Sequence, residues 1–378
     1  MLSTQSFIPA LVKMIREEIR SRGPQSFAWF MAQALYHPEH GYYSTDRAAI
    51  GRRGDYFTNV SVGPLFGELL AAQFVEIWER LGQIENFLIV EQGAHHGQFA
   101  RDVLESTRRR SPEFFSGLRY QIVEPFSALQ DRQSQGLKEF GDRVLWRRSL
   151  DELEPFVGVH FSNELLDAMP VNLHGKLVGL EGDKLVFVEG PGGTPMNQAM
   201  LDWIDCLSTK LERGFVIAVD YGFSRAEFRE VLQVRAKHRA LGSPFDEIGE
   251  ADITAHVNWT DLAERAQANG LRVAGFTDQH HFLTGIISEF GRGGTPRRAI
   301  GPSGPEAAPP ANASPARTDW GQLLLPSDSK TKRALQTLLH PEMLGRSFQV
   351  LALEKDVDLA ERLSGFKFAR NPCQALGL

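Results

Sequence analysis

Two acidic residues stand where short apolar runs end, and a glycine-bearing turn follows the first of them. Glu91 follows residues 87–90, and Gly93 and Gly97 come before a polar helical stretch. Glu124 ends the next apolar run, 27 residues after Gly97. Such a turn lets the backbone approach a ligand and exposes N–H groups of the following helix, and a carboxylate after the second strand can accept hydrogen bonds from ribose hydroxyls. The spacing fits S-adenosylmethionine at least as well as a nicotinamide cofactor, and a turn that is merely tight stays an alternative.

A second polar group follows a later apolar run. The run at 157–161 ends at Ser162, and Asn163, Glu164 and Asp167 follow. Carboxylates can hold a guanidinium through two hydrogen bonds, so Glu164 and Asp167 are candidates for binding a cationic acceptor. The alternative is that the three residues cap a helix after the strand, because Asn side chains accept bonds from N–H groups of a first helical turn.

Histidine and cysteine do not form a recognisable metal motif. The histidines at 95–96 and 280–281 are adjacent pairs with no supporting cluster, and Cys206 and Cys373 cannot fill a four-ligand zinc site. No metal is predicted. The chain has neither a G-x-S-x-G nor a Walker sequence, so no motif indicates a hydrolase or an NTPase.

The elements that position these residues alternate between strand and helix patterns. Short apolar runs at 87–90, 118–123, 157–161 and 215–219 each end in polar or acidic residues, and 348–353 predicts a closing strand. Strands alternating with helices indicate right-handed crossovers and a mostly parallel sheet. The polar residues then gather at the carboxyl ends of the strands, where such sheets bind ligands.

Composition divides the chain into two predicted parts. Residues 1–85 are expected to form an N-terminal helical cap with a glycine-rich loop, and residues 86–378 the α/β domain. Within the second part, about 171–189 predicts an inserted β-hairpin that turns at residues 182–183. Residues 291–317 contain 19 Gly, Pro, Ala or Ser among 27, which is typical of a flexible tether.

Charge and targeting signals restrict the class of ligand and the location that we expect. The 378 residues carry 41 basic and 47 acidic side chains, for a net charge of −6, which argues against a broad nucleic-acid surface. No apolar stretch is long enough to span a membrane, and we find no signal or transit peptide pattern. A cytoplasmic location is therefore predicted.

Several segments together resemble the MidA family, whose mitochondrial member is a protein arginine methyltransferase required for respiratory complex I assembly. The matching segments run in order along nearly the whole chain: 41–43, 54–58, 66–68, 163–171, 220–222 and 251–257. The resemblance implies a class I methyltransferase fold, which is Rossmann-like, with a seven-stranded, mostly parallel sheet, an N-terminal helical cap and inserted elements. It also implies methyl transfer from S-adenosylmethionine to a protein side chain, with arginine the expected residue.

The resemblance assigns roles to individual residues. S-adenosylmethionine is expected in the turn of Glu91, Gly93 and Gly97, with Glu124 on the ribose. The loop that carries Asp55 and Thr58 is expected to fold over that site. Glu164 and Asp167, with Asn163 beside them, are expected to act on the acceptor. The partner is expected to be a protein substrate, with a respiratory-complex subunit as one candidate, and a homodimer is allowed for.

Three positions depart from the family pattern. His95 stands where the family has glycine, Ser61 where it has a carboxylate, and Arg148 where it has an acidic residue. These changes surround one predicted pocket. They keep open an alternative function, a methyltransferase-fold assembly factor with weak or no catalysis that acts by binding proteins.

Overall fold

The computed structural model describes residues 8–44, 58–190, 197–237, 239–290, 329–358 and 361–378. A central sheet runs through it in the order β13-β14-β8-β5-β2-β3-β4. Its strands are β2 (Phe87–Gln92), β3 (Leu118–Val123), β4 (Val144–Arg147), β5 (Phe156–Asn163), β8 (Leu211–Phe223), β13 (Arg272–Asp278) and β14 (Phe348–Lys355). The two-residue β12 (Val257–Asn258) pairs with the end of β8.

Only β14 breaks the parallel pattern of this sheet, because it lies antiparallel to both of its neighbours, β8 and β13. The pairs β2·β3, β2·β5, β3·β4 and β5·β8 are all parallel. The seven-stranded, mostly parallel sheet predicted from the sequence is therefore confirmed. Residues 87–91 of β2 are all buried, as expected for a strand covered on both faces.

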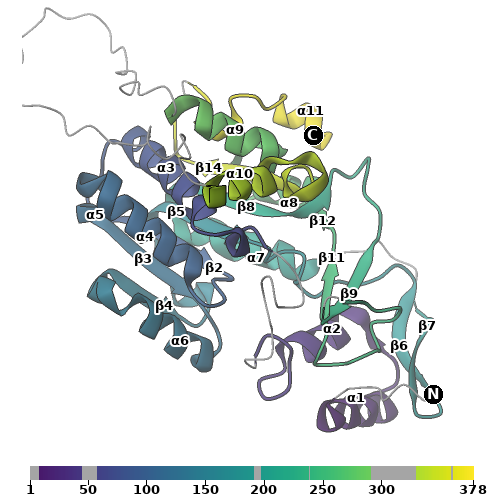
Figure 1. The fold of residues 1–378 in the computed structure, drawn as a ribbon. Coiled ribbons are helices and arrows are strands. Elements are labelled where there is room, and N and C mark those ends of the chain that lie inside the picture. The colour runs from purple at the N-terminus through teal and green to yellow at the C-terminus, as the bar shows by residue number, and fades with distance from the viewer. Residues whose placement is uncertain (1–7, 45–57, 191–196, 238, 291–328, 359–360) are drawn as a thin grey trace, which may run out of the picture.

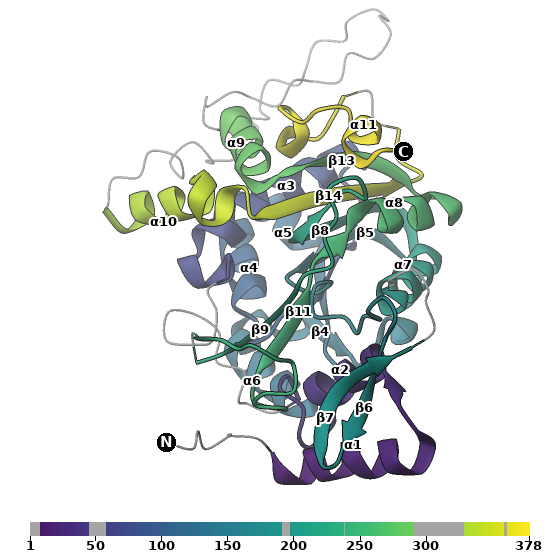
Figure 2. The ribbon, with the colours of Figure 1, turned by 90° about the vertical axis from the view of Figure 1, so that its right-hand side faces the viewer.

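Helices cover both faces of the central sheet, and Figure 2 shows α4 and α7 on opposite sides of it. One apolar core lies under α3 (Leu65–Arg80), α4 (Gln98–Arg110), α5 (Pro112–Gly117), α9 (Gln279–Phe290) and α10 (Ser329–Leu339). A second core lies under α7 (Gln198–Lys210), α8 (Trp259–Ala268) and α11 (Pro372–Leu376). The helix α6 (Ser127–Leu137) follows β3 and contacts α4.

The helix α3 packs closely against α4. A Cβ atom added to Gly67 would lie 2.6 Å from Cβ of Asp102 on α4, so glycine is needed at this crossing. The sequence grouped α3 with the N-terminal cap, but its buried face belongs to the core over the central sheet. The division at residue 85 stays a prediction.

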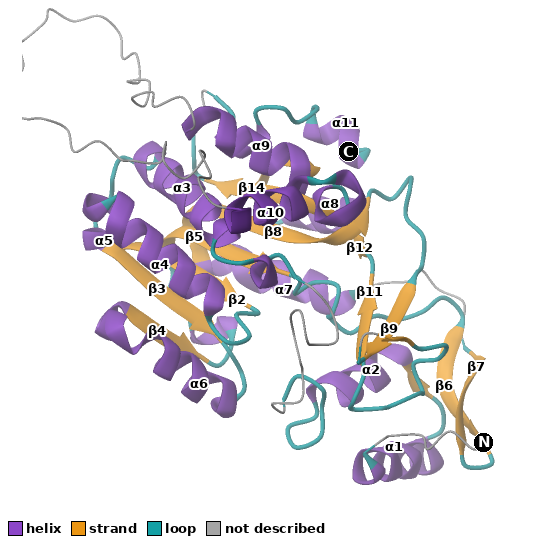
Figure 3. Ribbon diagram, in the orientation of Figure 1, coloured by secondary structure: helices purple, strands orange, loops and turns teal. Residues whose placement is uncertain are grey.

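The cap is built from three distant parts of the chain, and Figures 1 and 3 show it at the opposite end of the molecule from α9 and α11. A third apolar core joins α1 (Pro9–Arg22) and α2 (Phe27–Tyr36) to two small sheets. These sheets are β1-β6-β7 and β10-β9-β11. Their strands are β1 (Gln25–Ser26), β6 (Lys176–Glu181), β7 (Lys184–Glu189), β9 (Leu232–Ala236), β10 (Arg239–Ala240) and β11 (Asp252–Ala255).

The inserted hairpin predicted near residues 171–189 is present as β6 and β7. Short turns of helix complete the described structure: η1 (Val60–Val62), η2 (Lys138–Arg143), η3 (Leu150–Glu152), η5 (Pro341–Gly345) and η6 (Ser364–Phe366). The predicted tether at 291–317 lies outside the described residues. No helix of the described chain is long and apolar enough to cross a membrane.

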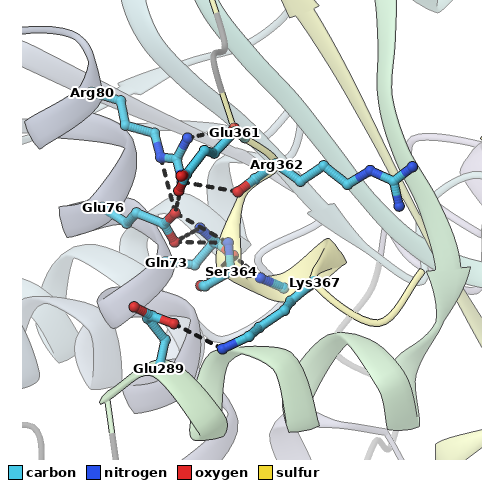
Figure 4. Close-up of polar contacts among 9 residues, drawn as sticks. Gln73, Glu76, Arg80, Glu289, Glu361, Arg362, Ser364 and Lys367 are labelled. Carbon is cyan, nitrogen blue, oxygen red and sulfur yellow. Dashed lines mark hydrogen bonds and ion pairs between the residues drawn. The ribbon is translucent and has the colours of Figure 1, made fainter. Parts of the chain in front are cut away.

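Buried and half-buried polar contacts fasten the C-terminal segment to α3 (Figure 4). Both carboxylate oxygens of Glu76 accept from the N–H of Ser364 at 3.1 Å. The guanidinium of Arg80 donates to the same carboxylate at 2.6 Å and to the backbone carbonyls of Glu361 and Arg362. Because α3 also packs against α4, this clamp ties the end of the chain to the elements beside the predicted site.

Candidate active site

The turn between β2 and α4 contains three residues in the left-handed conformation. Gly93, His95 and Gly97 have φ values of +82°, +46° and +76°, and Gly97 N donates to Ala94 O at 2.7 Å. Glycine adopts this conformation readily, whereas a residue with a side chain is disfavoured there by about 1–2 kcal/mol. His95 is therefore the strained position of this turn.

The side chain of His95 packs against its neighbour. The ring centroids of His95 and His96 lie 3.7 Å apart, and Nε2 of His96 lies 2.8 Å from Nη1 of Arg132 on α6. The turn thus accommodates a histidine at this position by packing its ring, tilted by 31°, against that of His96 beside α6.

Glu124 follows β3 directly and is only 5% exposed. The N–H of Phe126 donates to its Oε1 at 3.2 Å, and the side-chain amide of Gln133 donates to Oε2 at 3.1 Å. Burial raises the pKa of Glu124 to about 7, although both hydrogen bonds act in the opposite direction. Each carboxylate oxygen retains a lone pair, so the group can still accept ribose hydroxyls.

Glu91 lies deeper than the sequence suggested. Its carboxylate accepts a hydrogen bond from the Tyr120 hydroxyl at 2.6 Å, within the core between the sheet and α4. Burial raises the pKa of Glu91 to about 7; the Tyr120 bond lowers it, and the carboxylate of Asp102 raises it further. Glu91 thus lies in the core just before the turn. Its contact with a cofactor stays a prediction.

Thr58 and Ser61 bond to each other at the start of η1. The N–H of Ser61 donates to Oγ1 of Thr58 at 3.1 Å, and the N–H of Thr58 donates to Oγ of Ser61 at 3.3 Å. This reciprocal pattern is a capping box in which serine replaces the usual carboxylate. The departure at Ser61 therefore keeps the local structure. Asp55 lies outside the described residues.

Asn59 connects this capping box to the end of β5. Its side chain is fully buried, and Nδ2 donates to Oδ1 of Asn163 at 2.9 Å. Asn163 in turn donates to Oε1 of Glu164 at 2.9 Å, and the N–H of Asn59 approaches the same oxygen at 3.4 Å. Sequence reasoning missed Asn59, because these partners lie more than 100 residues away; only its place beside Thr58 was a signal.

Glu164 is held in a conformation that is unusual for its type. Its φ is +53°, and non-glycine residues held in this region cluster at functional sites. Burial raises the pKa of Glu164 to about 8, with further contributions from the carboxylates of Asp220 and Asp252. Near neutral pH the side chain therefore holds a proton that a nearby cation can displace.

Asp220, at the end of the buried part of β8, orders the turn that follows β5. Its Oδ2 accepts from the N–H groups of Leu165, Leu166 and Asp167 at 3.1, 2.7 and 3.3 Å. Residues 164–170 form a turn without a helix. The alternative that Asn163, Glu164 and Asp167 cap a helix after the strand is therefore wrong, because Asp220 binds these N–H groups instead.

Asp167 lies within a group of buried carboxylates. It is 5% exposed, and burial together with Asp220, Asp252 and Glu164 raises its pKa well above the ordinary value. In the described part of the chain, no basic side chain forms an ion pair with Glu164, Asp167 or Asp220 within 4.0 Å. Buried acids without a basic partner favour a cationic ligand.

Two tyrosines of the cap close this acidic group on one side. The Tyr43 hydroxyl donates to Asp252 at 2.6 Å, and the Tyr36 hydroxyl donates to the carbonyl of Ala168 at 2.9 Å. The two rings stack with centroids 5.5 Å apart. The cap thus supplies part of the site.

The predicted residues form two groups that face each other. Asp167, Asp252 and Glu124 all raise the pKa of Tyr36 above its ordinary value, in addition to its burial. Leu165 of the acidic turn lies over Gly93, since a Cβ atom there would be 3.4 Å from its Cδ1. Glu124 and the acidic group therefore lie near each other at the carboxyl ends of β2, β3, β5 and β8, and the contact of Glu124 with ribose stays a prediction.

Other candidates lie outside this arrangement. Arg148 is exposed, and its backbone N–H donates to Glu152 at 2.8 Å. His281 bonds to Asp278, and His280 contacts the carbonyl of Leu339. Within the described ranges, no group of three or more His, Cys, Asp or Glu side chains is placed to hold a metal ion.

Comparison with known proteins identifies this arrangement. The chain matches the family described as "Putative S-adenosyl-L-methionine-dependent methyltransferase" over residues 69–178 and 193–277, just over half of its length. A Drosophila melanogaster relative, the mitochondrial protein arginine methyltransferase NDUFAF7 homolog, is 25% identical over 332 residues, which cover 74% of this chain and 75% of the relative. The human mitochondrial protein arginine methyltransferase NDUFAF7 is 25% identical over 328 residues, which cover 73% of each chain.

Two solved structures share the whole fold. A COG1565 superfamily member from Burkholderia thailandensis bound to S-adenosyl-homocysteine superposes with a TM-score of 0.77 at 26% identity, covering 97% of this chain and 96% of that one. A native crystal structure of a COG1565 superfamily protein from the same organism gives 0.74 at the same identity and coverage. The predicted fold and cofactor are therefore confirmed.

The comparisons also correct one prediction. The sequence favoured a cytoplasmic location, but these relatives from Drosophila melanogaster and Homo sapiens, and a further one from Bos taurus, are all named as mitochondrial. The cytoplasmic prediction is wrong on this evidence. It rested on the lack of a targeting pattern, which is a weak signal.

Proposed function

Because the chain belongs to the family of S-adenosyl-L-methionine-dependent methyltransferases, we propose that it methylates a guanidinium nitrogen of an arginine side chain in a protein. Its cofactor is S-adenosylmethionine. The observation that carries the acceptor assignment is the acidic group of half-buried Glu164 with buried Asp167 and Asp220, which has no ion pair with a basic side chain of the described structure. The relatives named as protein arginine methyltransferases support the same acceptor.

On the cofactor side, this chain's residues bind S-adenosylmethionine and orient it. S-adenosylmethionine supplies an electrophilic methyl group when bound. Glu124, with its remaining lone pairs, accepts hydrogen bonds from the ribose hydroxyls. The turn at Gly93 and Gly97 lets the backbone come close, and the N–H groups at the start of α4 are available as donors. Thr58 and Asp55 are proposed to contact the same cofactor.

On the acceptor side, carboxylates hold the guanidinium. Asn163 and Asn59 occupy Oε1 of Glu164, which leaves Oε2 to accept from a guanidinium N–H. Asp167 supplies a second carboxylate. Much of the rate of such a transfer comes from holding the two reacting groups in the correct orientation. The attacking nitrogen must also lose a proton. A pKa of about 8 suits Glu164 to accept that proton.

The test separates cofactor binding from acceptor chemistry. The protein is incubated with S-adenosylmethionine and arginine-containing peptides, beside peptides in which lysine replaces arginine, and methylation is read by mass spectrometry. We expect methylation of arginine only. Glu164→Gln should reduce the rate at least 100-fold while calorimetric affinity for S-adenosylhomocysteine changes less than threefold.

The pH profile adds a second check on Glu164. Its ionised form binds the cation, so activity of the unaltered protein should rise as the pH increases through about 8. A Glu164→Gln protein that methylates at the unaltered rate, or equal methylation of lysine peptides, would contradict the proposal.

Two finer proposals come from the resemblance alone. We infer that the substrate protein is a respiratory-complex subunit and that the enzyme forms a homodimer. Labelled methyl transfer into isolated respiratory-complex subunits, against a set of soluble matrix proteins, tests the first. Sedimentation equilibrium tests the second, and a single species of 42.2 kDa would contradict it.

A further inference from the structure

We propose that Gln133 is a positioning residue that holds the strained turn and the ribose carboxylate in one fixed arrangement. The inference rests on the proposed cofactor role of Glu124 and the turn. Gln133 lies on α6 and is fully buried. Its Nε2 donates to the carbonyl of His95 at 2.7 Å and to Oε2 of Glu124 at 3.1 Å, and its Oε1 accepts from Nε1 of Trp146 at 2.9 Å.

The three partners of Gln133 belong to three different strands. His95 follows β2, Glu124 follows β3, and Trp146 lies in β4, so a single side chain sets the spacing between three strand ends. Only an amide fits this role, because it offers two donors and an acceptor on one planar group. A carboxylate lacks the donors, and an ammonium or guanidinium lacks the acceptor.

The contact with His95 explains how the turn tolerates a side chain there. At a φ of +46°, histidine is disfavoured relative to glycine, and the bond from Gln133 fixes the carbonyl of the strained residue. The stem of Gln133 also packs beside Gly97, where a Cβ atom would lie 3.5 Å from its Cγ. A fully satisfied buried network of this kind rigidifies what it joins. Gln133 thus helps to hold histidine at position 95 in this strained conformation.

The experiment measures affinity for S-adenosylhomocysteine by calorimetry in a double-mutant cycle at residues 133 and 95. Gln133→Met keeps the length of the side chain but removes its three hydrogen bonds, and should weaken binding at least tenfold at a temperature well below unfolding. His95→Gly relaxes the turn, so adding it to Gln133→Met should raise the affinity for S-adenosylhomocysteine at least threefold. In the unaltered background, His95→Gly should change affinity less than threefold.

Gln130→Met is the matched control. Gln130 lies one turn earlier on α6 and donates to the backbone carbonyl of Glu124, so its loss touches neither the carboxylate nor the turn. It should change affinity less than threefold. A Gln133→Met protein that binds within threefold of the unaltered one would overturn the proposal. So would a loss of the same size whether residue 95 is histidine or glycine, because a general loss of structure would not depend on that residue.

A second variant covers failure of Gln133→Met to fold. Gln133→Glu keeps the acceptor for Trp146 but places a second carboxylate beside Glu124. We expect weak binding at pH 8 that recovers at least fivefold at pH 6, where one of the two acids is protonated and can donate. Affinity that does not depend on pH would overturn the role of Gln133 as a donor. No binding by the unaltered protein would instead refute the cofactor site itself.

Discussion

At the scale of single residues, Glu124 is the sharpest test of the cofactor side. Removing its carboxylate leaves ribose hydroxyls without their acceptor, which typically costs about 1–3 kcal/mol. Glu124→Ala should therefore weaken S-adenosylhomocysteine binding tenfold or more in a calorimetric titration. The melting temperature of the free protein should also fall, because the N–H of Phe126 and the side-chain amide of Gln133 lose their acceptor.

The exposed acid Glu154 provides a control for Glu124, since Glu154→Ala removes a similar charge from the surface. That variant should bind as the unaltered protein does. Equal affinities for Glu124→Ala and Glu154→Ala would remove Glu124 from the site.

The sequence predicted the position of a site residue best when the signal came from its neighbours in the chain. Glu91 and Glu124 stand where apolar runs stop, and this pattern alone placed them at strand ends. Asp220 was seen only as part of a motif, because the N–H groups that it binds lie 53–55 residues earlier. Gln133 carries no sequence signal, since its partners come together only after β2, β3 and β4 have paired.

At the scale of elements, the clamp between α3 and the C-terminal segment should contribute to stability without touching ligand affinity. The side chain of Glu76 is 12% exposed and paired with Arg80 at 2.6 Å. Glu76→Ala would leave the N–H of Ser364 and the guanidinium without their partner, which costs on the order of 2–4 kcal/mol. The unfolding midpoint in urea should fall clearly.

Glu289 is the matched control for Glu76, because its ion pair with Lys367 fastens the same segment but is half exposed. Glu289→Ala should lower the midpoint by much less, as surface pairs contribute about 0–1 kcal/mol. An equal effect of the two substitutions would contradict the clamp.

Elements with strong periodicity were predicted well, and their ends less well. The run at 118–123 is β3, and the run at 348–353 lies within β14. β8 is much longer than the predicted 215–219, because Leu211 and Phe223 extend it with partners from β5 and β12. Those additional residues belong to the strand through pairing with distant chain, which periodicity does not report.

At the scale of the whole molecule, buried carboxyls should make the free protein more stable in mild acid. Burial raises the pKa of Glu91, Glu124 and Asp220 to about 7 and that of Glu164 to about 8. Unfolded carboxyls titrate near pH 4. The folded state therefore binds more protons between these values, so the contribution of these four acids to stability is fully present below about pH 4 and is lost as the pH rises through 7 to 8.

Two histidines oppose this trend. Burial lowers the pKa of His160 to about 3 and also lowers that of His256, so their contribution to stability is lost as the pH falls below about 6.5. The four acids outweigh the two histidines, and the calorimetric midpoint of unfolding should be several degrees higher at pH 5.5 than at pH 8. Glu164→Gln should narrow that difference. A higher midpoint at pH 8 would show that these acids are ionised in the folded protein.

The overall assembly of the cap was beyond sequence reasoning. Its helices were predicted at the N-terminus and its hairpin as an insertion, but nothing local links them to β9 and β11. A shared apolar core joins the three parts only in three dimensions. Sequence reasoning therefore gave no role at the site to Tyr36 or Tyr43, although they contact the turn after Asp167 and the carboxylate of Asp252.

The three-part cap also sets an order of events during synthesis. A ribosome releases α1 and α2 first, yet the strand that carries Asp252 emerges more than 200 residues later. Until then only the β6–β7 hairpin can cover the two helices, and the apolar side chains that meet β9 and β11 stay exposed, while β2, β3 and β5 can already pair. Contacts between such distant parts of a chain form slowly. The growing chain should thus acquire its nucleotide-binding half first and its acceptor pocket last, so an incomplete chain has no closed pocket in which to methylate a protein.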